Sequence, residues 1–448
     1  MSQFETLASR RNFIRSATGA AVSYAALSGA PAMVHAAGSD EIKVGLIGCG
    51  GRGTGAASQF LLSTDTPVKL WAMGDLFRDQ LDASHKLLSE GAEARYDREK
   101  FGPLTAKMAV PEERRFVGFE AYKGVLASGV DVVILATPPH FRPEHFEAAV
   151  AAGKHVFMEK PVGVDPVGIR RVIAAAKQAK DKGLSVVAGT QRRHQNHYRE
   201  IIRRVQDGAI GEIVAAQCYW NMGELWLEEA KRNWEGRKAH GWSDMEFQCR
   251  NWLFYAWLSG DHICEQHVHN LDIIHWALGA NPLQAMGVGG RAARTGPEYG
   301  NIYDHFAVEY EYPNGVRVSS MCKQMKGSAF VVAERLVGTR GQTYTDGSGG
   351  YITGQNAYKY EGSNPNPYYQ EHADLIRSIR EGKPLAEGVG VAESTMVAIL
   401  GRMSTYTGRQ VKWDWAMQGS KLDLRPTKYE FGPLPEQPVA IPGKTPLV

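Results

Sequence analysis

The sequence predicts an α/β protein: a doubly wound parallel sheet comes first, and an α+β domain with a large, mainly antiparallel open sheet follows. Short apolar runs at 42–47, 68–73, 130–137 and 155–158 alternate with segments of helical pattern, as in a parallel sheet. Longer runs at 211–220 and 304–324 follow, and the second contains a Pro313-Asn314-Gly315 turn, which indicates an antiparallel hairpin. At 448 residues the chain also exceeds what one hydrophobic core usually organises.

The first 36 residues differ from the rest of the chain. Arg10 and Arg11 precede an uncharged, alanine-rich run from 17 to 34, and the segment ends in Val34-His35-Ala36. This pattern is typical of a twin-arginine export signal, so we expect cleavage near Ala36 and a periplasmic or secreted protein. The apolar run is short and broken by glycine and proline, which favours a cleaved signal over the alternative of a retained anchor.

The first domain is expected over 40–162 and carries a glycine-rich turn directly after its first strand. Gly48-Cys49-Gly50-Gly51-Arg52-Gly53 fits the G-x-G-x-x-G pattern, with a helical segment following. The glycines allow a tight turn and close approach of the backbone to a pyrophosphate, which the helix N-terminus attracts. The pattern therefore predicts a dinucleotide site that includes Gly48, Gly50, Gly51, Arg52 and Gly53.

Asp75 falls 22 residues after Gly53, at the end of the second predicted strand. A carboxylate at this place accepts hydrogen bonds from the adenosine ribose and favours NAD. Arg52 and Arg78 leave NADP open, because either guanidinium could bind a 2′-phosphate.

The second domain is expected over 163–418. Its clearest helices are predicted at 165–182, 196–207, 370–381 and 391–407, and a proline-rich extended tail is predicted over 419–448. The formal net charge of +3 gives no sign of nucleic-acid binding, and five scattered cysteines without a CxxC pair predict neither a disulfide framework nor a zinc ribbon.

Two further strand ends resemble the Gfo/Idh/MocA family of sugar and inositol oxidoreductases. These are the Thr137-Pro138-Pro139-His140 turn and the segment 152–161, which ends in Glu159-Lys160-Pro161. The resemblance continues through 189–194, 207–213 and 260–279, and so covers most of the chain after the leader.

The resemblance implies roles for individual residues. It places Lys160 beside the nicotinamide and substrate, gives cofactor contacts to Glu159 and to the turn Thr137, Pro138 and His140, and makes Glu265 and His269 the other catalytic pair. The chain departs from the family pattern at three positions: Glu265 replaces the usual aspartate, His267 replaces a glycine, and Arg142 stands where many exported relatives have a second histidine.

Sugar oxidation needs a group that takes the hydroxyl proton, which the nicotinamide cannot supply. His269 is the natural base near neutral pH, since its reference pKa is about 6.5. Lys160 would then stabilise the developing alkoxide, and Glu265 would orient a neighbouring donor or a second hydroxyl. The roles of Lys160 and His269 can be exchanged without contradicting the sequence.

The cluster of His262, Glu265, His267 and His269 has two further interpretations. It resembles a metal site in composition, although no metal is predicted because spacing alone does not guarantee convergent ligands. The other interpretation is a buried polar cluster, while His267 is also a candidate substrate contact.

Seven of the ten tryptophans lie between 220 and 276, interleaved with basic residues. Aromatic planes pack on the apolar faces of sugar rings, so this segment is the candidate sugar-facing wall, with Trp252 and Arg250 as substrate contacts. Burial in a core or a subunit interface is the alternative. Arg192 is a further candidate contact, for an acidic sugar.

Three functions follow from these residues. The first is an exported NAD(P)-dependent oxidoreductase that acts on a ring CH–OH of a carbohydrate and keeps its nucleotide tightly bound. The second is a redox-neutral, NAD-dependent glycoside-cleaving enzyme that works through a transient keto-sugar. The third is a non-catalytic nucleotide or sugar sensor. No nucleic acid or integral membrane partner is expected, and an open sheet face predicts a homo-dimer or homo-tetramer.

Overall fold

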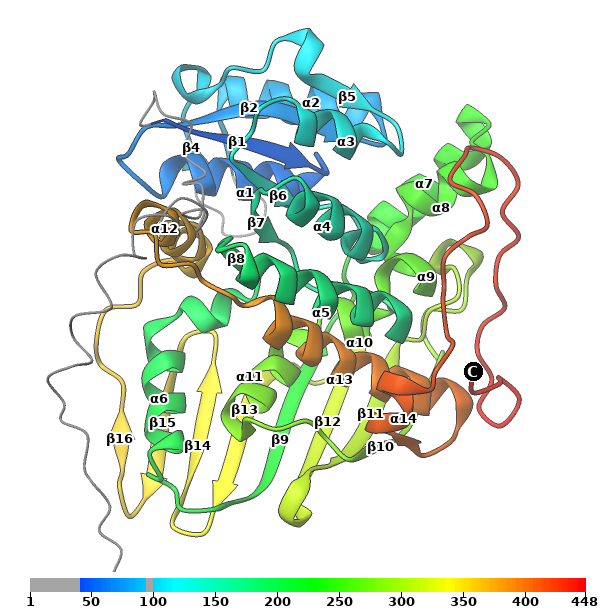
Figure 1. Cartoon of the computed structure of the whole chain (residues 1–448). Helices are drawn as coiled ribbons and strands as arrows, with labels where there is room; N and C mark the ends of the chain where they lie inside the picture. Colours follow the sequence, from blue (N-terminus) through cyan, green and yellow to red (C-terminus); the bar gives the residue numbers. More distant parts are fainter. Residues whose placement is uncertain (1–40, 94–99) are drawn as a thin grey trace, which may run out of the picture. The chain divides into compact units, whose positions relative to one another are not determined.

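The computed structural model describes residues 41–93 and 100–448 (Figure 1). The predicted export signal lies outside these residues. The described part belongs to one compact unit, and none of its helices is long and apolar enough to cross a membrane.

Six parallel strands form the N-terminal sheet, in the order β5-β2-β1-β6-β7-β8. The strands are β1 (Ile42–Ile47), β2 (Val68–Asp75), β5 (Arg115–Val117), β6 (Val132–Leu135), β7 (His155–Met158) and β8 (Val186–Ala188). The strand order proceeds outward from β1 and β6 in opposite directions. Ligands of such sheets bind outside the carboxyl ends of the strands, at this switch point.

Helices cover both faces of the parallel sheet. One face packs against α1 (Gly51–Leu62), α2 (Arg78–Glu90) and α12 (Pro367–Arg380), and the other against α3 (Ala121–Ala127), α4 (Arg142–Ala151) and α5 (Pro166–Asp181). Since β8 and α12 both follow residue 162, the predicted end of the first domain is too early. The chain returns to this sheet twice after the Glu-Lys-Pro segment, and that segment marks only the end of β7.

Nine strands form the second sheet, in the order β16-β15-β14-β13-β9-β12-β11-β10-β17. They are β9 (Ile213–Met222), β10 (Gln284–Gly290), β11 (His305–Glu311), β12 (Arg317–Gln324), β13 (Val331–Gly338), β14 (Gly341–Asp346), β15 (Gly349–Gly354), β16 (Tyr358–Lys359) and β17 (Val411–Lys412). All neighbours are antiparallel except β9 and β12. The predicted fold class is confirmed, and so is the hairpin at Pro313.

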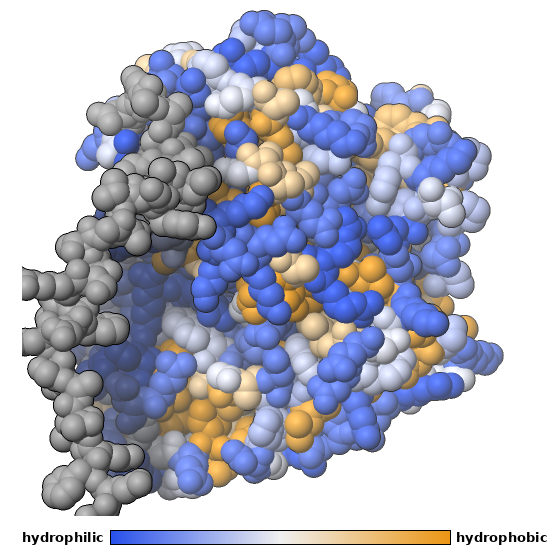
Figure 2. Space-filling view, in the orientation of Figure 1, coloured by the Kyte–Doolittle hydropathy of each residue, from blue (hydrophilic) through white to orange (hydrophobic). Residues whose placement is uncertain are grey.

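The helices α6 (Asn196–Gln206), α11 (Val268–Leu278) and α13 (Gly388–Thr407) cover the inner face of this second sheet. The outer face leaves Met286 and Val288 exposed. On the side of the molecule that Figure 2 shows, hydrophobic side chains lie in separate groups among hydrophilic ones. The predicted dimer or tetramer stays a prediction.

Apart from one helix of 14 residues, the remaining elements are short. They are β3 (Ala92–Glu93), β4 (Lys100–Phe101), α7 (Leu227–His240), α8 (Asp244–Arg250), α9 (Ala256–Ser259), α10 (His262–Glu265) and α14 (Trp413–Gln418), together with several single 3₁₀ turns. From Gly419 onward the chain contains no helix or strand, and it passes alongside α8 (Figure 1).

Candidate active site

A cavity of about 900 Å³ begins at the carboxyl ends of β1, β2 and β6 and extends to residues of the second domain. Its nucleotide end is lined by the glycine-rich loop, Asp75 and Thr137. Its other end is lined by Lys160, Glu265 and side chains from the segment 220–253. The fold therefore places the phosphate loop and the predicted catalytic residues around one cavity.

The glycine-rich loop has the geometry that its residues predict. Gly48 has a φ of +96°, and a Cβ on Gly53 would lie 1.8 Å from the oxygen of Gly48, so neither position accepts a side chain. A Cβ on Gly50 would meet nothing within 4 Å, because this residue borders open space. Helix α1 starts here with no side-chain cap and no acidic residue in its first turn. The residues thus fit a pyrophosphate at the helix N-terminus.

Asp75 ends β2 at the side of the loop where the adenosine ribose of a dinucleotide is expected. Its two carboxylate oxygens accept hydrogen bonds from the backbone N–H groups of Cys49 (2.6 Å) and Phe77 (2.8 Å). Burial raises the pKa of Asp75 to about 6, while these two hydrogen bonds act in the opposite direction. At neutral pH the group is a fixed carboxylate that can accept ribose hydroxyls, and so the loop and Asp75 together fit NAD.

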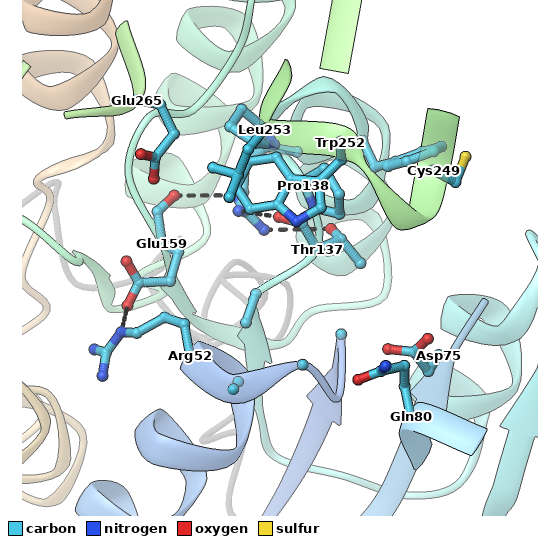
Figure 3. A pocket seen from close by; sticks show the side chains of 18 of the residues that line it. Arg52, Asp75, Gln80, Thr137, Pro138, Glu159, Cys249, Trp252, Leu253 and Glu265 are labelled. Carbon is cyan, nitrogen blue, oxygen red and sulfur yellow. Dashed lines mark hydrogen bonds and ion pairs between the residues drawn. The ribbon is translucent and has the colours of Figure 1, made fainter. Parts of the chain in front are cut away.

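Arg52 lines the cavity, but carboxylates already hold its guanidinium. Its Nε lies 2.5 Å from Glu159 Oε1, and a second nitrogen lies 3.0 Å from Oε1 of the buried Glu371 on α12. Figure 3 shows Arg52 beside Glu159, on the opposite side of the view from Asp75. Arg78 does not line the cavity and pairs with Asp82 and Glu112.

Arg142 holds the two strand ends that carry the family motifs. Its Nε donates to the backbone oxygen of Glu159 (3.0 Å), and a terminal nitrogen donates to the backbone oxygen of Thr137 (2.6 Å). Burial lowers the pKa of Arg142 to about 10, against the opposing charge of Glu159. Thr137 and Pro138 line the cavity, whereas His140 does not. The His140 side chain instead packs on Trp257, so the geometry does not support its predicted cofactor contact.

Lys160, Glu265 and His269 meet in the wall of the cavity. Lys160 Nζ donates to the backbone oxygen of Glu265 (2.5 Å) and to its Oε1 (3.1 Å). The other carboxylate oxygen of Glu265 accepts from Gln266. The His269 ring stacks on Trp220 at a centroid distance of 5.6 Å. Burial, and after it the positive charge of Lys160, hold the pKa of His269 well below its ordinary value.

Two predicted substrate contacts lie outside the cavity lining. Arg192 is buried and pairs with Glu334 on β13. His267 is fully buried, and its Nε2 lies 2.7 Å from Ser320 Oγ. His262 packs edge-on against Phe306 in the core. Among the residues that the structure describes, no group of three His, Cys, Asp or Glu side chains is placed to bind a metal.

Three of the clustered tryptophans line the cavity: Trp220, Trp226 and Trp252. Arg250 also lines it, but its guanidinium pairs with Asp79 on α2 and lies 3.9 Å from the ring centre of Phe77. Since Phe77 follows Asp75 closely, Arg250 lies toward the nucleotide end of the cavity, and its predicted substrate contact stays a prediction.

Sequence reasoning missed several lining residues. They include Phe77, Phe119, Phe141, Arg232, Asn233 and Tyr368. The three phenylalanines each follow the end of a parallel strand, which was a usable signal. Arg232 and Asn233 lie on α7, and no motif in the sequence marks them.

Two family models match the chain. Residues 42–188 match an oxidoreductase family with an NAD-binding Rossmann fold (GFO_IDH_MocA), and residues 198–344 match the GFO/IDH/MocA C-terminal domain. These ranges include Lys160, Glu265 and His269.

Individual relatives cover less of the chain. A 2,7-anhydro-N-acetylneuraminate hydratase of Escherichia coli (strain K12) is 31% identical over 222 residues, which are 48% of this chain and 52% of that protein. An inositol 2-dehydrogenase of Rhizobium meliloti is 32% identical over 87 residues, 19% of this chain and 26% of the relative. The chain spans about half the length of the hydratases it matches.

Solved structures share the fold. The aldose-aldose oxidoreductase of Caulobacter crescentus superposes with a TM-score of 0.61 at 19% identity, over 83% of this chain and 99% of the other. A scyllo-inositol dehydrogenase of Lactobacillus casei, solved with NAD(H) and scyllo-inositol, gives 0.59 at 18% identity over 83% and 99%. With its NAD-binding Rossmann domain and the C-terminal domain that accompanies it, the chain belongs to the Gfo/Idh/MocA family of oxidoreductases.

Proposed function

We propose that the protein oxidises a ring CH–OH group of a sugar or sugar derivative with NAD, that the nucleotide stays bound between turnovers, and that the carbonyl group of a second sugar takes the hydride back and so restores NAD. The observation that carries this proposal is the meeting of Lys160, Glu265 and His269 in the wall of the cavity that starts at the phosphate loop. When bound, NAD supplies the acceptor for the hydride, so the chain must supply the proton acceptor and the charge stabilisation.

His269 is assigned as the base. Its lowered pKa keeps the imidazole neutral at pH 7, so the ring is free to accept the hydroxyl proton. Lys160 already donates to two oxygens of Glu265, which fix its ammonium group at the cavity wall. From there the ammonium can donate to the same substrate oxygen and stabilise its developing negative charge. Glu265 acts as the positioning residue for Lys160.

The substrate class follows from the wall opposite the nucleotide loop. Trp220, Trp226 and Trp252 offer aromatic planes for the apolar faces of a sugar ring. Arg232 on α7 adds donors for hydroxyl or carboxylate oxygens. Such a mixture of planes and donors is typical of a carbohydrate site.

The arrangement favours NAD over NADP. Asp75 would repel a 2′-phosphate, and the two arginines that could bind that phosphate are already paired with carboxylates. Arg52 is held by Glu159 and Glu371, and Arg78 by Asp82 and Glu112.

Redox-neutral glycoside cleavage is the second candidate, because a hydratase of an anhydro-sugar is among the relatives. Cleavage through a transient keto-sugar needs additional proton transfers. Glu265 lies in the same wall as His269, and its second carboxylate oxygen accepts a hydrogen bond from Gln266. The residues for a further acid/base step are therefore present.

One experiment separates these readings. The full chain is purified, its bound nucleotide is identified after denaturation, and it is then incubated with a panel of sugars and aryl glycosides. A net change in nicotinamide absorbance supports the oxidoreductase, and release of the aglycone without that change supports cleavage. A protein that binds sugar and shows neither reaction would overturn both and leave a sensor.

Location and assembly are part of the proposal. The Arg10-Arg11 pattern supports twin-arginine export with cleavage near Ala36, to be tested by cell fractionation and N-terminal sequencing of the exported protein. The exposed outer face of the nine-stranded sheet supports a homo-dimer or homo-tetramer, which light scattering tests directly.

A further inference from the structure

The segment 429–440 of the C-terminal tail, here called the strap, contacts both domains at the nucleotide end of the cavity. It lies beyond the residues that the two family models match. It contains no helix or strand, so its own backbone does not hold it in place. Its position therefore depends on the groups that it touches.

On the side of the parallel sheet, the strap contacts three phenylalanines. Phe431 stacks on Phe77, with ring centres 5.9 Å apart and an interplanar angle of 5°, and lies 5.6 Å from the ring of Phe119. The ring of Tyr429 lies 5.8 Å from both Phe119 and Phe141. The three phenylalanines follow the ends of β2, β5 and β6, and each lines the cavity. The strap thus covers the outside of loops whose inner surface faces the nucleotide.

On the side of the second domain, hydrogen bonds fix the strap to α8. The backbone oxygen of Gly432 accepts from the N–H of Met245 (3.1 Å). The backbone oxygen of Leu434 accepts from Gln248 Nε2 (2.8 Å). The strap is therefore bonded to α8 within three residues of Phe431, the last of its aromatic contacts.

Helix α8 makes a second connection at the same place. The guanidinium of Arg250 lies 3.9 Å from the ring centre of Phe77 and forms two hydrogen bonds to the carboxylate of Asp79, at 3.0 and 3.2 Å. Phe77 is therefore in contact with Phe431 of the strap and with Arg250. Both of these partners come from outside the parallel-sheet domain.

We propose that Tyr429, Phe431 and Arg250 form a latch over the adenosine end of the cavity, which slows the release of NAD. The proposal rests on the proposed function for the identity of the nucleotide. Release requires the loops after β2 and β5 to move away from the adenosine, and the latch ties these loops to α8. The two rings of the strap are cofactor-positioning residues, because they act through Phe77 and Phe119.

The test compares three proteins: the wild type, the double variant Tyr429→Ala/Phe431→Ala, and Ile441→Ala as a matched control. Ile441 follows the strap and is 51% exposed. Each protein is loaded with NADH and mixed rapidly with excess NAD, and the loss of bound NADH fluorescence gives the dissociation rate. The double variant is expected to release NADH about 10- to 100-fold faster, from the usual strength of aromatic pairs. The control is expected to match the wild type.

An unchanged dissociation rate in a folded double variant overturns the latch. If the double variant does not fold, Phe431→Leu serves instead, because it keeps an apolar side chain but removes the stacked ring. Sugar oxidation by the wild type is measured in parallel, which separates the two proposals. If the variant and the wild type release NADH at the same rate and the wild type oxidises sugar, the latch alone is refuted. If the variant releases NADH faster but the wild type oxidises no sugar, the proposed function alone is refuted. A wild type that does not bind NADH refutes both.

Discussion

Replacement of Glu265 by glutamine tests the proposed division of work in the active site. Glu265→Gln keeps the size of the side chain and an oxygen that can accept a hydrogen bond, but removes its negative charge. In the native protein Lys160 Nζ lies 3.1 Å from the Glu265 carboxylate, and both side chains are only 11% exposed. The variant therefore changes the charge beside the ammonium group while its backbone contact to Glu265 can persist.

The structure sets the size of the expected effect. Two unit charges 3.1 Å apart attract by about 5 kcal/mol at an effective dielectric constant near 20, which is an upper bound for this pair. The backbone oxygen of Glu265 and the new amide oxygen still accept from Lys160, so the loss should approach that of one charged hydrogen bond, about 1.5–3 kcal/mol. If Lys160 stabilises the transition state, kcat falls about 10- to 100-fold.

The assay is steady-state oxidation of the sugar found in the substrate screen, in the presence of an excess of a second, acceptor sugar, followed by the appearance of the oxidised sugar. The dissociation constant of NAD should not change, because Glu265 does not belong to the phosphate loop. Glu228→Gln is the matched control, since Glu228 is 75% exposed and its loss should leave kcat unchanged. An unchanged or higher kcat in a folded Glu265→Gln protein would refute the positioning role of Glu265.

Three further predictions concern the cofactor, the base and the substrate wall. Gly53→Ala should abolish NAD binding in calorimetry, because its Cβ would lie 1.8 Å from the oxygen of Gly48; retained affinity would contradict the loop assignment. In a pH profile, kcat/KM should fall on the acid side with a midpoint well below pH 6.5, because the base must be unprotonated and burial lowers the pKa of His269. A midpoint at or above pH 6.5 would argue against His269 as the base. Trp252→Ala should raise the KM for sugar about 5- to 100-fold while the affinity for NAD stays within a factor of three, and an unchanged KM in initial-rate measurements would remove Trp252 from the sugar wall.

The fold could be predicted because its signals are local. Alternating apolar runs, the glycine turn after β1 and the turn at Pro313 each act within a few residues of the element they specify. The nucleotide loop could be predicted for the same reason, since Gly48, Gly53 and Asp75 occupy fixed places at strand ends. The domain boundary could not be predicted in this way, because the parallel sheet continues through α5 to β8, past the Glu-Lys-Pro segment, and because α12 packs on it only after most of the second sheet.

The direction of charged and aromatic side chains could not be predicted, because partners far along the chain decide it. Arg192 faces the buried Glu334, which is 142 residues away, instead of the cavity. His267 bonds with Ser320 on β12. Both residues were candidates because their side chains could bind a sugar, but the sequence does not show which buried partners they contact instead.

Arg52 shows how such a partner changes the interpretation of a motif. A guanidinium inside a glycine-rich loop suggests a ligand for phosphate, yet in the structure it bonds to Glu159 and Glu371. Because Glu159 directly precedes Lys160, this ion pair connects the phosphate loop to the strand end that carries Lys160, the lysine proposed to be catalytic. Glu371 adds α12 to the same network, since its Oε1 lies 3.0 Å from a terminal nitrogen of Arg52. If the phosphate loop holds the nucleotide as proposed, Arg52 links the nucleotide site to the strand end that precedes Lys160, and a change at Arg52 should then alter turnover as well as NAD affinity.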